Sequence, residues 1–494
     1  MKKKIAAILL FCMCCLSALG AQAITVTGLE TETIERVWAG NKFFARMEAL
    51  TGIAVEPVGI AQQDEYTSML DQMMRGDIQT DVLFKADLTR AQEIALLDSG
   101  AIIDLSALID AHMPNLSALL AAHPEWRDVI ALEDGRIASL PLINEKERQA
   151  TMWINCAWLE KLGMDMPQNL DELTQALLAM SGADLNGNGK HDETGAELIG
   201  GYEMRWLLPY FGIVADDYHL ARGADGKIVF APELPEYRAF IALLRQWHDS
   251  GVLPQDAFTR VHATALLSAA DEEIPETAGM LLSVTPYTHL NAKAVMDYEP
   301  LLLAGPDGAV RWRDLLGAVW TGCFAVTSRC QEVEKALAWV DALYSEEGAL
   351  LGYAGIEGED YTINDEGLWA FALDGNRDIS KLRSEVLMYT GVAMPGLYPA
   401  DFVHRVDSEL DHHVFASSEK VRAVSERVTQ AYCLNTADQA RANELALVIG
   451  RLVDEGIARF ATGEVELTDE SYAAWLDELR SAGSGELAAL FADQ

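Results

Sequence analysis

The feature that most restricts the fold of this chain is an alternation of short β-branched runs with amphipathic stretches. The runs ITVTG (24–28), IAVEPVGI (53–60) and DVLFK (81–85) have the composition of strands. Between them, NKFFARMEALTG (41–52) and DEYTSMLDQMMRGD (64–77) carry apolar residues at helical spacing and reach a glycine at or near their ends. This alternation predicts an α/β fold in which helices cover the faces of a parallel sheet.

Two later stretches predict helices that pack in a core. Residues 235–253 begin with a proline, place apolar side chains on one stripe and contain Gly251 near their end. Residues 330–353 have the pattern of a single helix, with Val333, Leu337 and Val340 in register. Neither stretch contains a pattern that requires chemistry.

The first 23 residues have the pattern of a signal peptide. Three lysines precede an apolar run that is too short to span a bilayer comfortably, and small residues follow up to Ala23. We therefore expect the mature chain to begin at Ile24 and to be secreted or held at the cell surface. Lipid anchoring is the alternative, since the leader contains cysteines, but the residues before them are not the small ones that lipid attachment needs. These cysteines are Cys12, Cys14 and Cys15.

The composition excludes several classes of function. The chain has 76 acidic and 37 basic residues and a formal net charge of -39, which argues against nucleic-acid or anionic-membrane binding through bulk charge. Half of its 494 residues are hydrophobic, so two or more lobes are expected. The cysteines beyond the leader are too scattered for a disulfide framework or a zinc site and are expected to be buried: Cys156, Cys323, Cys330 and Cys433.

One polar passage, DLNGNGKHDE at 184–193, matches most of an EF-hand calcium loop. A glycine, Gly189, stands at loop position 6, and the Lys190 carbonyl is available at position 7. Hard oxygen donors without sulfur or histidine favour calcium over zinc or copper. The side-chain donors at positions 1, 3, 5 and 9 are Asp184, Asn186, Asn188 and Asp192.

The loop departs from the EF-hand pattern at position 12, where Gly195 replaces the usual bidentate glutamate. Glu193 is the nearest residue that could close the site, and Glu197 is the second candidate. The alternative is a polar loop whose Asn-Gly pairs simply form turns. A single loop of this kind indicates a structural calcium ion rather than a sensor.

The segments around this loop resemble extracellular solute-binding proteins of family 1, the sugar-type receptors of ABC importers. The resemblance is carried by MWINCAWLEKLGMDMPQNLDELTQALLAMSG before the loop and by segments spread over most of the mature chain, whose order and spacing are together specific. The loop is most similar to that of the alginate-oligosaccharide-binding and lipoprotein branch. The other segments are MEALTGIAVEPV (47–58), LIDAHMPNLSALL (108–120), EDGRIASLP (133–141), YSEEGALLGYAGIEGEDYTINDEGLW (344–369) and YAAWLDELRSAG (472–483).

The resemblance implies a periplasmic-binding-protein-like clamp of type II, in which two α/β lobes close on a ligand around a hinge. It implies a first lobe of 24–141 plus 285–316 and a second lobe of 145–284 plus 317–494, which carries the calcium loop. It also implies that the chain is a monomer that captures a carbohydrate and delivers it to the transmembrane subunits of an ABC permease. The ion ligands implied are Asp184, Asn186, Asn188, the Lys190 carbonyl, Asp192 and Glu193.

Sugar sites combine aromatic platforms with polar side chains. We expect such platforms where the chain passes the cleft, although each aromatic residue could instead pack between the lobes, and each charged candidate could be a surface charge. The aromatic candidates are Trp153, Trp206, Tyr287 and Trp320, with Tyr361 and Trp369 as weaker ones. The polar candidates are Arg205 and Glu357.

The sequence carries no sign of catalysis. His412 and His413 are adjacent, so on a helix they point about 100 degrees apart and cannot bind one metal in the i, i+4 manner. The nucleophile-elbow, phosphate-loop and HExxH patterns are absent from the sequence. We therefore expect a binding protein and not an enzyme. The alternatives are a polysaccharide-active enzyme or adhesin with the same fold, and a receptor for a peptide or a polyol.

Overall fold

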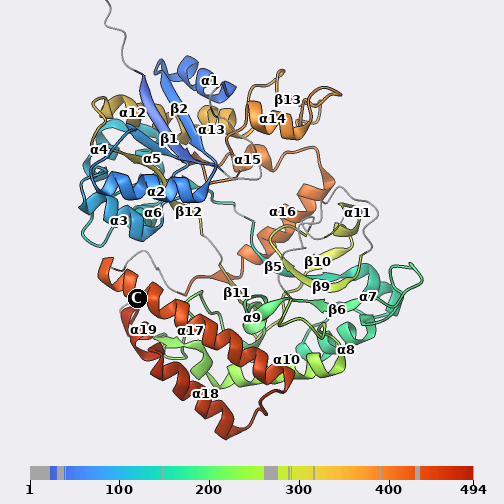
Figure 1. Cartoon of the computed structure of the whole chain (residues 1–494). Coiled ribbons are helices and arrows are strands. Elements are labelled where there is room, and N and C mark those ends of the chain that lie inside the picture. Colours follow the sequence, from blue (N-terminus) through green and yellow to red (C-terminus); the bar gives the residue numbers. More distant parts are fainter. Residues whose placement is uncertain are drawn as a thin grey trace, which may run out of the picture.

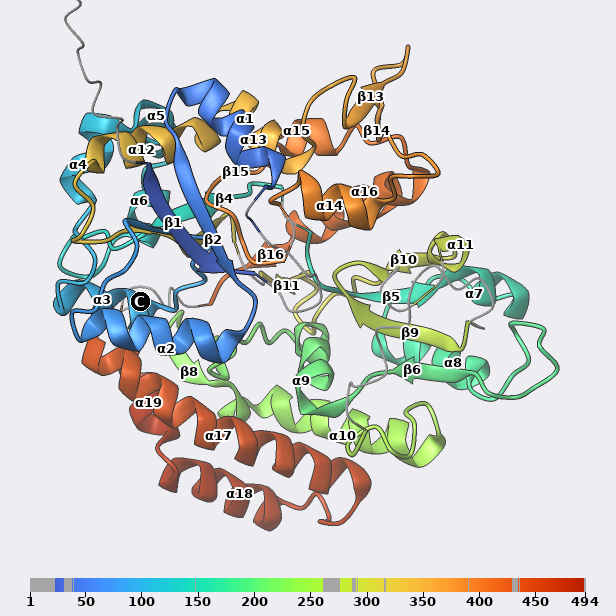
Figure 2. The ribbon, with the colours of Figure 1, turned by 45° about the horizontal axis from the view of Figure 1, so that its top comes forward.

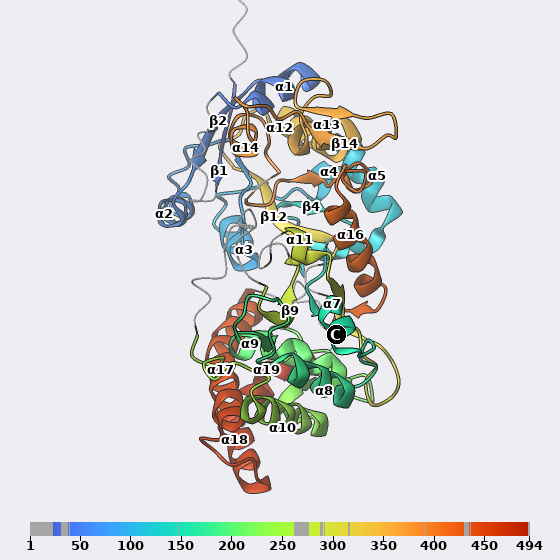
Figure 3. The same ribbon diagram turned by 90° about the vertical axis from the view of Figure 1, so that its right-hand side faces the viewer.

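The computed structural model describes residues 23–492, except 31–37, 39, 147, 261–275, 287–289, 291, 315–316, 390, 429–433 and 435. Within these residues, no helix combines the length and the apolar character that are needed to cross a membrane. The leader residues 1–22, the ligand candidate Tyr287 and Cys433 lie outside the described residues. The described part of the chain forms two lobes, which lie one above the other in Figure 1 and Figure 3.

The first lobe contains a six-stranded sheet whose N-terminal strands are parallel, as the alternating pattern predicts. Ile24 of β1 lies opposite Val55 of β2, and Val26 lies opposite Val82 of β3. β12 runs antiparallel between β3 and β4, and β15 pairs in parallel with β4. The order is β15-β4-β12-β3-β1-β2, with β1 Ile24–Leu29, β2 Val55–Ile60, β3 Val82–Phe84, β4 Leu140–Ile143, β12 Val319–Val326 and β15 Gly396–Leu397.

Helices cover both faces of this sheet because successive side chains of a strand point to opposite sides. Val82 and Phe84 belong to one buried cluster, whereas Leu83 between them belongs to another. The first cluster is closed by α1 Lys42–Thr51, α4 Ser106–His112, α5 Pro114–Ala122, α6 Pro124–Ile130 and α12 Val333–Asp341. The second is closed by α2 Gln63–Met74 and α3 Arg90–Asp98.

The stretch predicted as a single helix over 330–353 is broken. It forms α12, the short turn η4 Ala342–Tyr344 and then α13 Glu346–Tyr353. Ser345 adopts an extended backbone conformation, and its side chain accepts a hydrogen bond from the Gly348 N–H, so it is the N-cap of α13. Apolar periodicity continues through this break, which is why the pattern alone does not reveal it.

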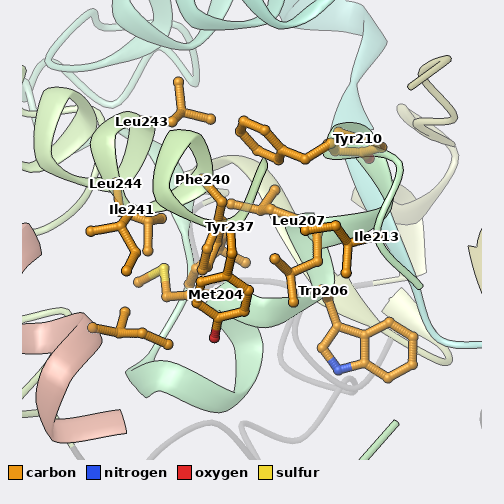
Figure 4. Packing of buried hydrophobic residues seen from close by; sticks show 14 of the residues in the cluster. Met204, Trp206, Leu207, Tyr210, Ile213, Tyr237, Phe240, Ile241, Leu243 and Leu244 are labelled. Carbon is orange, nitrogen blue, oxygen red and sulfur yellow. The ribbon is translucent and has the colours of Figure 1, made fainter. Parts of the chain in front are cut away.

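The second lobe contains a four-stranded sheet of order β10-β5-β9-β6 and a large helical layer. Figure 4 shows how Trp206, Tyr237 and Phe240 pack in its main core. The strands are β5 Thr151–Asn155, β6 Thr194–Glu197, β9 Ala278–Ser283 and β10 Tyr298–Pro300. The helices are α7 Cys156–Leu162, α8 Leu170–Met180, α9 Gly200–Met204, η1 Arg205–Phe211, α10 Pro235–Ser250, α17 Thr436–Thr462, α18 Asp469–Ser481 and α19 Ser484–Leu490.

The division of the chain between the lobes differs from the expected one. Residues 285–316 were expected in the first lobe, yet β10 pairs with β5, and Trp312 is buried in the main core of the second lobe. Conversely, 317–494 was expected in the second lobe, yet β12 and β15 belong to the first-lobe sheet. The return to the first lobe therefore follows Trp312. The strand patterns do not reveal this, because they do not show which sheet a strand joins.

In the part of the chain that the structure describes, three connections join the lobes, and two of them contact each other. The Asn144 N–H donates to the Ala318 carbonyl at 2.7 Å, which ties the connection after β4 to the one before β12. The third connection leads into α16 Glu409–Arg422. Val414 of this helix packs with the second-lobe sheet, while the neighbouring Phe415 packs with a small cluster around α15 Ala400–Val403, so α16 bridges the two halves, as Figure 2 shows.

The remaining elements are short. β11 Trp312–Arg313 pairs with β16 Ser425–Glu426 beside the hinge. Two hairpins extend the lobes, and small helices connect the larger elements. The hairpins are β7 Leu220–Arg222 with β8 Ile228–Phe230 and β13 Tyr361–Ile363 with β14 Trp369–Phe371, and the helices are η2 Ala231–Glu233, α11 Ala292–Val295 and α14 Ile379–Glu385.

Candidate functional site

A cavity of about 660 Å³ lies between the two lobes beside the hinge. The first lobe contributes residues from the end of β4, the start of β12 and the segment after α14, whereas Val284 follows β9 of the second lobe. The bridging helix α16 contributes Leu410, Asp411 and Phe415. A cavity of this size fits a small oligosaccharide or a similar solute.

Aromatic side chains dominate one part of the cavity wall. The rings of Tyr353, Tyr389 and Tyr398 lie against one another, with centroid separations of 5.7, 5.4 and 5.1 Å. Trp320 at the start of β12 is half-buried, and its Nε1 donates to the Gly317 carbonyl at 3.2 Å, which orients the indole ring. These rings can offer apolar faces for the stacking of sugar rings.

Polar groups stand beside these aromatic rings. Asn144 is 9% exposed, and its Oδ1 has no hydrogen-bond partner among the described residues. The Arg148 guanidinium lies 2.9 Å from the Asp411 carboxylate and 4.6 Å from the centre of the Phe415 ring. The cavity therefore combines apolar ring faces with a few polar groups, which is the composition expected of a specific ligand site.

Two further cations line the cavity. Lys146 pairs with Asp401, and this hydrogen bond lowers the pKa of the Asp401 carboxyl. Arg383, at the last turn of α14, is exposed. The pKa of His404, whose ring stacks on Phe415, is lowered, first by burial and then by the charge of Lys146, which favours the neutral imidazole.

Of the ligand candidates named from the sequence, Trp320 lines the cavity. Trp153 is fully buried in β5, and its Nε1 donates to the Ser283 carbonyl at 2.9 Å. Trp206 is 2% exposed in the main core of the second lobe. Neither of these two rings has an exposed face that could stack on a sugar in this structure.

The other candidates lie elsewhere in the fold. Arg205 pairs with Asp454, and its guanidinium lies 5.7 Å from the centre of the Tyr202 ring. Glu357 is exposed on the hairpin extension of the first lobe. Tyr361 and Trp369 are buried in the same extension, where they pack on Phe402. None of the four lines the interlobe cavity.

Sequence reasoning did not identify most of the cavity residues. Each of the three tyrosines stands in a different local setting, at the end of α13 or in the loops around β15, and no shared spacing links them. A signal was present in the density of tyrosine, proline and glycine over 389–398, which is typical of loops that carry function. For Asn144 and the basic residues after it, the sole signal in the sequence was their position where the chain was predicted to pass from the first lobe to the second.

The ion loop, residues 184–193, lies in the second lobe between α8 and β6 and is shaped by its own side-chain acceptors. Asn186 Oδ1 accepts from the Asn188 N–H at 2.9 Å, and Asn188 Oδ1 accepts from the Lys190 N–H at 2.8 Å. Gly189 has φ 78°, a left-handed conformation that a side chain would disfavour. These successive turns are those that let alternate oxygens face one point.

The two aspartates of the loop are exposed. Asp184 Oδ1 accepts from the Gly189 N–H at 3.2 Å, and the Asp192 carboxylate accepts from the Asn188 amide at 3.2 Å. Across the described residues, no three His, Cys, Asp or Glu side chains converge as a metal centre. An ion in this loop would therefore depend on amide and carbonyl oxygens as well as carboxylates.

Glu193 differs from the aspartates because it is 5% exposed. Its Oε1 accepts from the Leu185 and Asn186 N–H groups at 2.8 and 3.1 Å. Its Oε2 is buried and has no hydrogen-bond partner among the described residues. A buried carboxylate oxygen without a donor is unfavourable unless a cation compensates it, so the loop fits a hard cation at this atom.

The structure also explains the glycine at loop position 12. A Cβ at Gly195 would lie 2.5 Å from the Leu177 carbonyl and 2.6 Å from Ser181 Oγ, so no glutamate fits there. Glu197, the second candidate for closing the site, pairs with Arg260. Glu193 is the remaining acidic residue beside the loop that points an uncompensated oxygen inward.

The adjacent histidines form no metal site. His413 Nε2 lies 2.7 Å from the Tyr298 carbonyl, and its ring centre is 6.1 Å from that of Trp153, so this residue serves in packing α16 on β5 and β10. Cys323 and Cys330 are buried, as the sequence predicts, whereas Cys156 is half-buried. All three are free thiols.

No family model matches the sequence. The fructooligosaccharide ABC transporter substrate-binding protein FusA of Streptococcus pneumoniae serotype 4 (strain ATCC BAA-334 / TIGR4) is 30% identical over 277 residues, which are 54% of this chain and 51% of that protein. Lipoprotein LipO of Bacillus subtilis (strain 168) is 23% identical over 241 residues, which are 44% of this chain and 45% of LipO. The chain thus spans about half the length of the curated relatives it matches.

Solved structures match over nearly the whole chain. S. pneumoniae FusA in complex with kestose has a TM-score of 0.73 at 20% identity and covers 95% of this chain and 98% of its own. A human-milk-oligosaccharide (HMO) binding ABC-transporter-associated solute-binding protein from Bifidobacterium longum infantis ATCC 15697 has a TM-score of 0.77 at 20% identity, with the same coverage. The alginate-binding protein AlgQ2, solved without calcium ion, has a TM-score of 0.70 at 17% identity and covers 96% of this chain and 98% of its own.

These comparisons confirm the predicted fold class, a two-lobed α/β clamp. They also confirm the resemblance inferred from the sequence, because the homologues are ABC-transporter substrate-binding proteins. The relatives are binding proteins.

Proposed function

We propose that this chain, whose homologues are ABC-transporter substrate-binding proteins, is the extracellular receptor of an ABC importer and captures an oligosaccharide between its lobes. The observation that carries the proposal is the interlobe cavity, where Trp320 and three tyrosines stand beside polar side chains from the hinge and α16. The names of the relatives support the ligand class, since FusA is a fructooligosaccharide receptor and the B. longum protein binds HMO. The partner would be the membrane-spanning permease of the importer.

The binding mechanism follows from where the cavity residues are attached. Trp320 and Tyr398 belong to the first lobe, Val284 belongs to the second, and Asp411 stands on the bridging helix. A ligand that contacts all of them has more favourable interactions when the lobes are closed than when they are open. Such a ligand shifts the population toward the closed form, which a permease could then recognise, and no bond is made or broken.

Side-chain contacts hold the hinge segments together. Asp314 accepts hydrogen bonds from Gln149 at 3.3 Å and from Arg427 at 3.1 Å, which ties three hinge segments together. Gly317 has φ 68°, and a Cβ there would lie 1.8 Å from the Arg427 guanidinium, so another residue would strain the backbone and displace the Arg427 side chain. These contacts lie within the hinge, so they would persist if the lobes rotated about it.

We further propose that the ion loop binds a structural calcium ion. Asp184, Asn186, Asn188, the Lys190 carbonyl, Asp192 and Glu193 would hold it. A bound calcium would cross-link the end of α8 to the start of β6. The unpaired Glu193 Oε2 supports this proposal, and so does the description of one FusA structure as an EF-hand mutant in complex with fructo-nystose.

The site of action would be outside the cytoplasmic membrane. We propose that the leader is removed near Ala23 and that the mature chain is secreted or held at the cell surface. One curated relative is described as a lipoprotein, which keeps a lipid anchor as the alternative. Mass spectrometry of the protein purified from its own cells would distinguish simple cleavage from lipid anchoring. A simply cleaved chain would begin at Ile24, whereas an anchored chain would begin at a cysteine of the leader and carry the added mass of the lipid.

Small-angle scattering tests the clamp proposal directly. Purified protein is measured with and without fructooligosaccharides, milk-type oligosaccharides and acidic oligosaccharides. We expect the radius of gyration to fall when at least one of them binds, because closure brings the lobes together. A chain that binds none of them and keeps its dimensions throughout would contradict the proposal.

A further inference from the structure

The described lining of the interlobe cavity carries more basic than acidic side chains, whereas the whole chain is acidic. The chain has 76 acidic and 37 basic residues. Among the described residues, the cavity is lined by three basic side chains, Lys146, Arg148 and Arg383, and by one acidic side chain, Asp411. An excess of basic side chains in a concave site raises the local positive potential and so favours an anionic ligand.

Two of these cations are already balanced by protein carboxylates. Arg148 lies 2.9 Å from the Asp411 carboxylate, and Lys146 pairs with Asp401, whose side chain is 93% exposed and does not line the cavity. Arg383 differs from both, because within the described part of the chain no carboxylate lies within ion-pair distance of it. The guanidinium of Arg383 is therefore available to an anionic group of a ligand.

A second, independent feature concerns a buried acceptor in the same wall. Asn144 is more than nine-tenths buried, and its Oδ1 has no donor among the described residues. A buried carbonyl oxygen without a donor costs free energy, so this atom is suited to accept a hydrogen bond from a ligand group that enters the cavity. A sugar hydroxyl is such a donor, whereas a bare inorganic anion is not.

We propose that the ligand is an acidic oligosaccharide, whose carboxylate pairs with Arg383 while a hydroxyl donates to Asn144 Oδ1 and its rings pack on Trp320 and the cavity tyrosines. This inference rests on the proposed receptor function and names its substrate class. Arginine binds carboxylates through two parallel N–H groups, so Arg383 would recognise both the charge and the planar shape of the carboxylate.

The test compares matched acidic and neutral sugars by titration calorimetry. The pairs are trigalacturonate with its methyl ester and sialyllactose with lactose, and kestose is added as a neutral oligosaccharide. The proteins are the wild type, Arg383→Gln and the control Arg451→Gln, which removes the same charge from an exposed site on α17. We expect an acidic sugar to bind at least about tenfold more tightly than its neutral partner, and this preference to weaken as salt is added.

The preference should fall to near unity in Arg383→Gln and persist in Arg451→Gln. If neutral sugars bind as tightly as their acidic partners, or if Arg383→Gln keeps the preference, the inference is wrong while the receptor function stands. If no sugar of the panel binds, the inference and the receptor function both lose their support. A circular-dichroism melt of each variant confirms that the protein tested is folded.

Discussion

The interlobe cavity and the ion loop are opposite kinds of site. The ion loop consists of ten consecutive residues between one helix and one strand, and its geometry comes from backbone turns that its own side chains support. The cavity is assembled from separate segments between Leu142 and Phe415, and its residues meet only because two lobes and a bridging helix come together. The ion loop can therefore be recognised in the sequence, because its residues are consecutive. The cavity proposed to bind the solute cannot, because its residues come from distant segments.

The same contrast separates aromatic residues that look equivalent in the sequence. Trp153 and Trp320 both lie close to chain crossings, yet Trp153 is fully buried under α16 and Trp320 is half-buried in the cavity wall. Position near a crossing therefore does not distinguish a core side chain from a ligand contact. The distinction depends on which face of the strand the neighbouring helix covers.

The largest expected effect comes from Trp153→Ala. Loss of a fully buried indole and of its hydrogen bond to Ser283 should lower the free energy of unfolding by about 3–5 kcal/mol. Chemical denaturation followed by circular dichroism measures this loss, and Trp153→Phe should lose less. An unchanged denaturation midpoint together with lost sugar binding would show instead that Trp153 contacts the ligand.

A smaller effect, on binding and not on stability, is expected from Trp320→Ala. Removal of the half-buried ring should weaken binding of the preferred sugar by about 2 kcal/mol, roughly 30-fold, while the melting temperature changes little. Titration calorimetry measures the affinity, and Glu357→Gln is the control because this exposed residue lies outside the cavity. Equal affinities of Trp320→Ala and the wild type would remove Trp320 from the site.

The smallest effect is expected from emptying the ion loop. With free calcium at about ten times its dissociation constant, the ion would stabilise the fold by about 1.4 kcal/mol, so a chelator should lower the melting temperature of the wild type by a few degrees. Differential scanning calorimetry with and without chelator should show no such difference for Asp184→Ala or Glu193→Gln. Identical melting temperatures for every protein under both conditions would contradict calcium binding.

Calcium removal should also leave the affinity for sugar nearly unchanged, because the loop lies between α8 and β6 and none of its residues lines the cavity. A large loss of sugar affinity on chelation would show that the two sites are coupled. In that case the ion loop and the cavity would be thermodynamically linked and not independent sites.

Much of the fold could be predicted from the sequence. The parallel pairing of β1, β2 and β3 and the end of α1 at Gly52, where φ is 72°, follow from local patterns. The limits of α10 at Pro235 and Gly251 do so as well. The break at Ser345 and the lobe to which β10 and β12 belong could not be predicted, because apolar periodicity is the same whichever sheet a segment packs on.

The sequence by itself determined the α/β character of the chain and its family resemblance, and it supplied the candidate donors of the ion loop, since each depends on residues that are neighbours along the chain. Tertiary structure alone decided that Gly195 has no room for a side chain, that Trp153 is buried and that Asn144, Arg383 and Trp320 share one cavity. The physical reason is that burial and charge pairing depend on partners far away in sequence. A pattern of spacing within one segment carries no information about those partners.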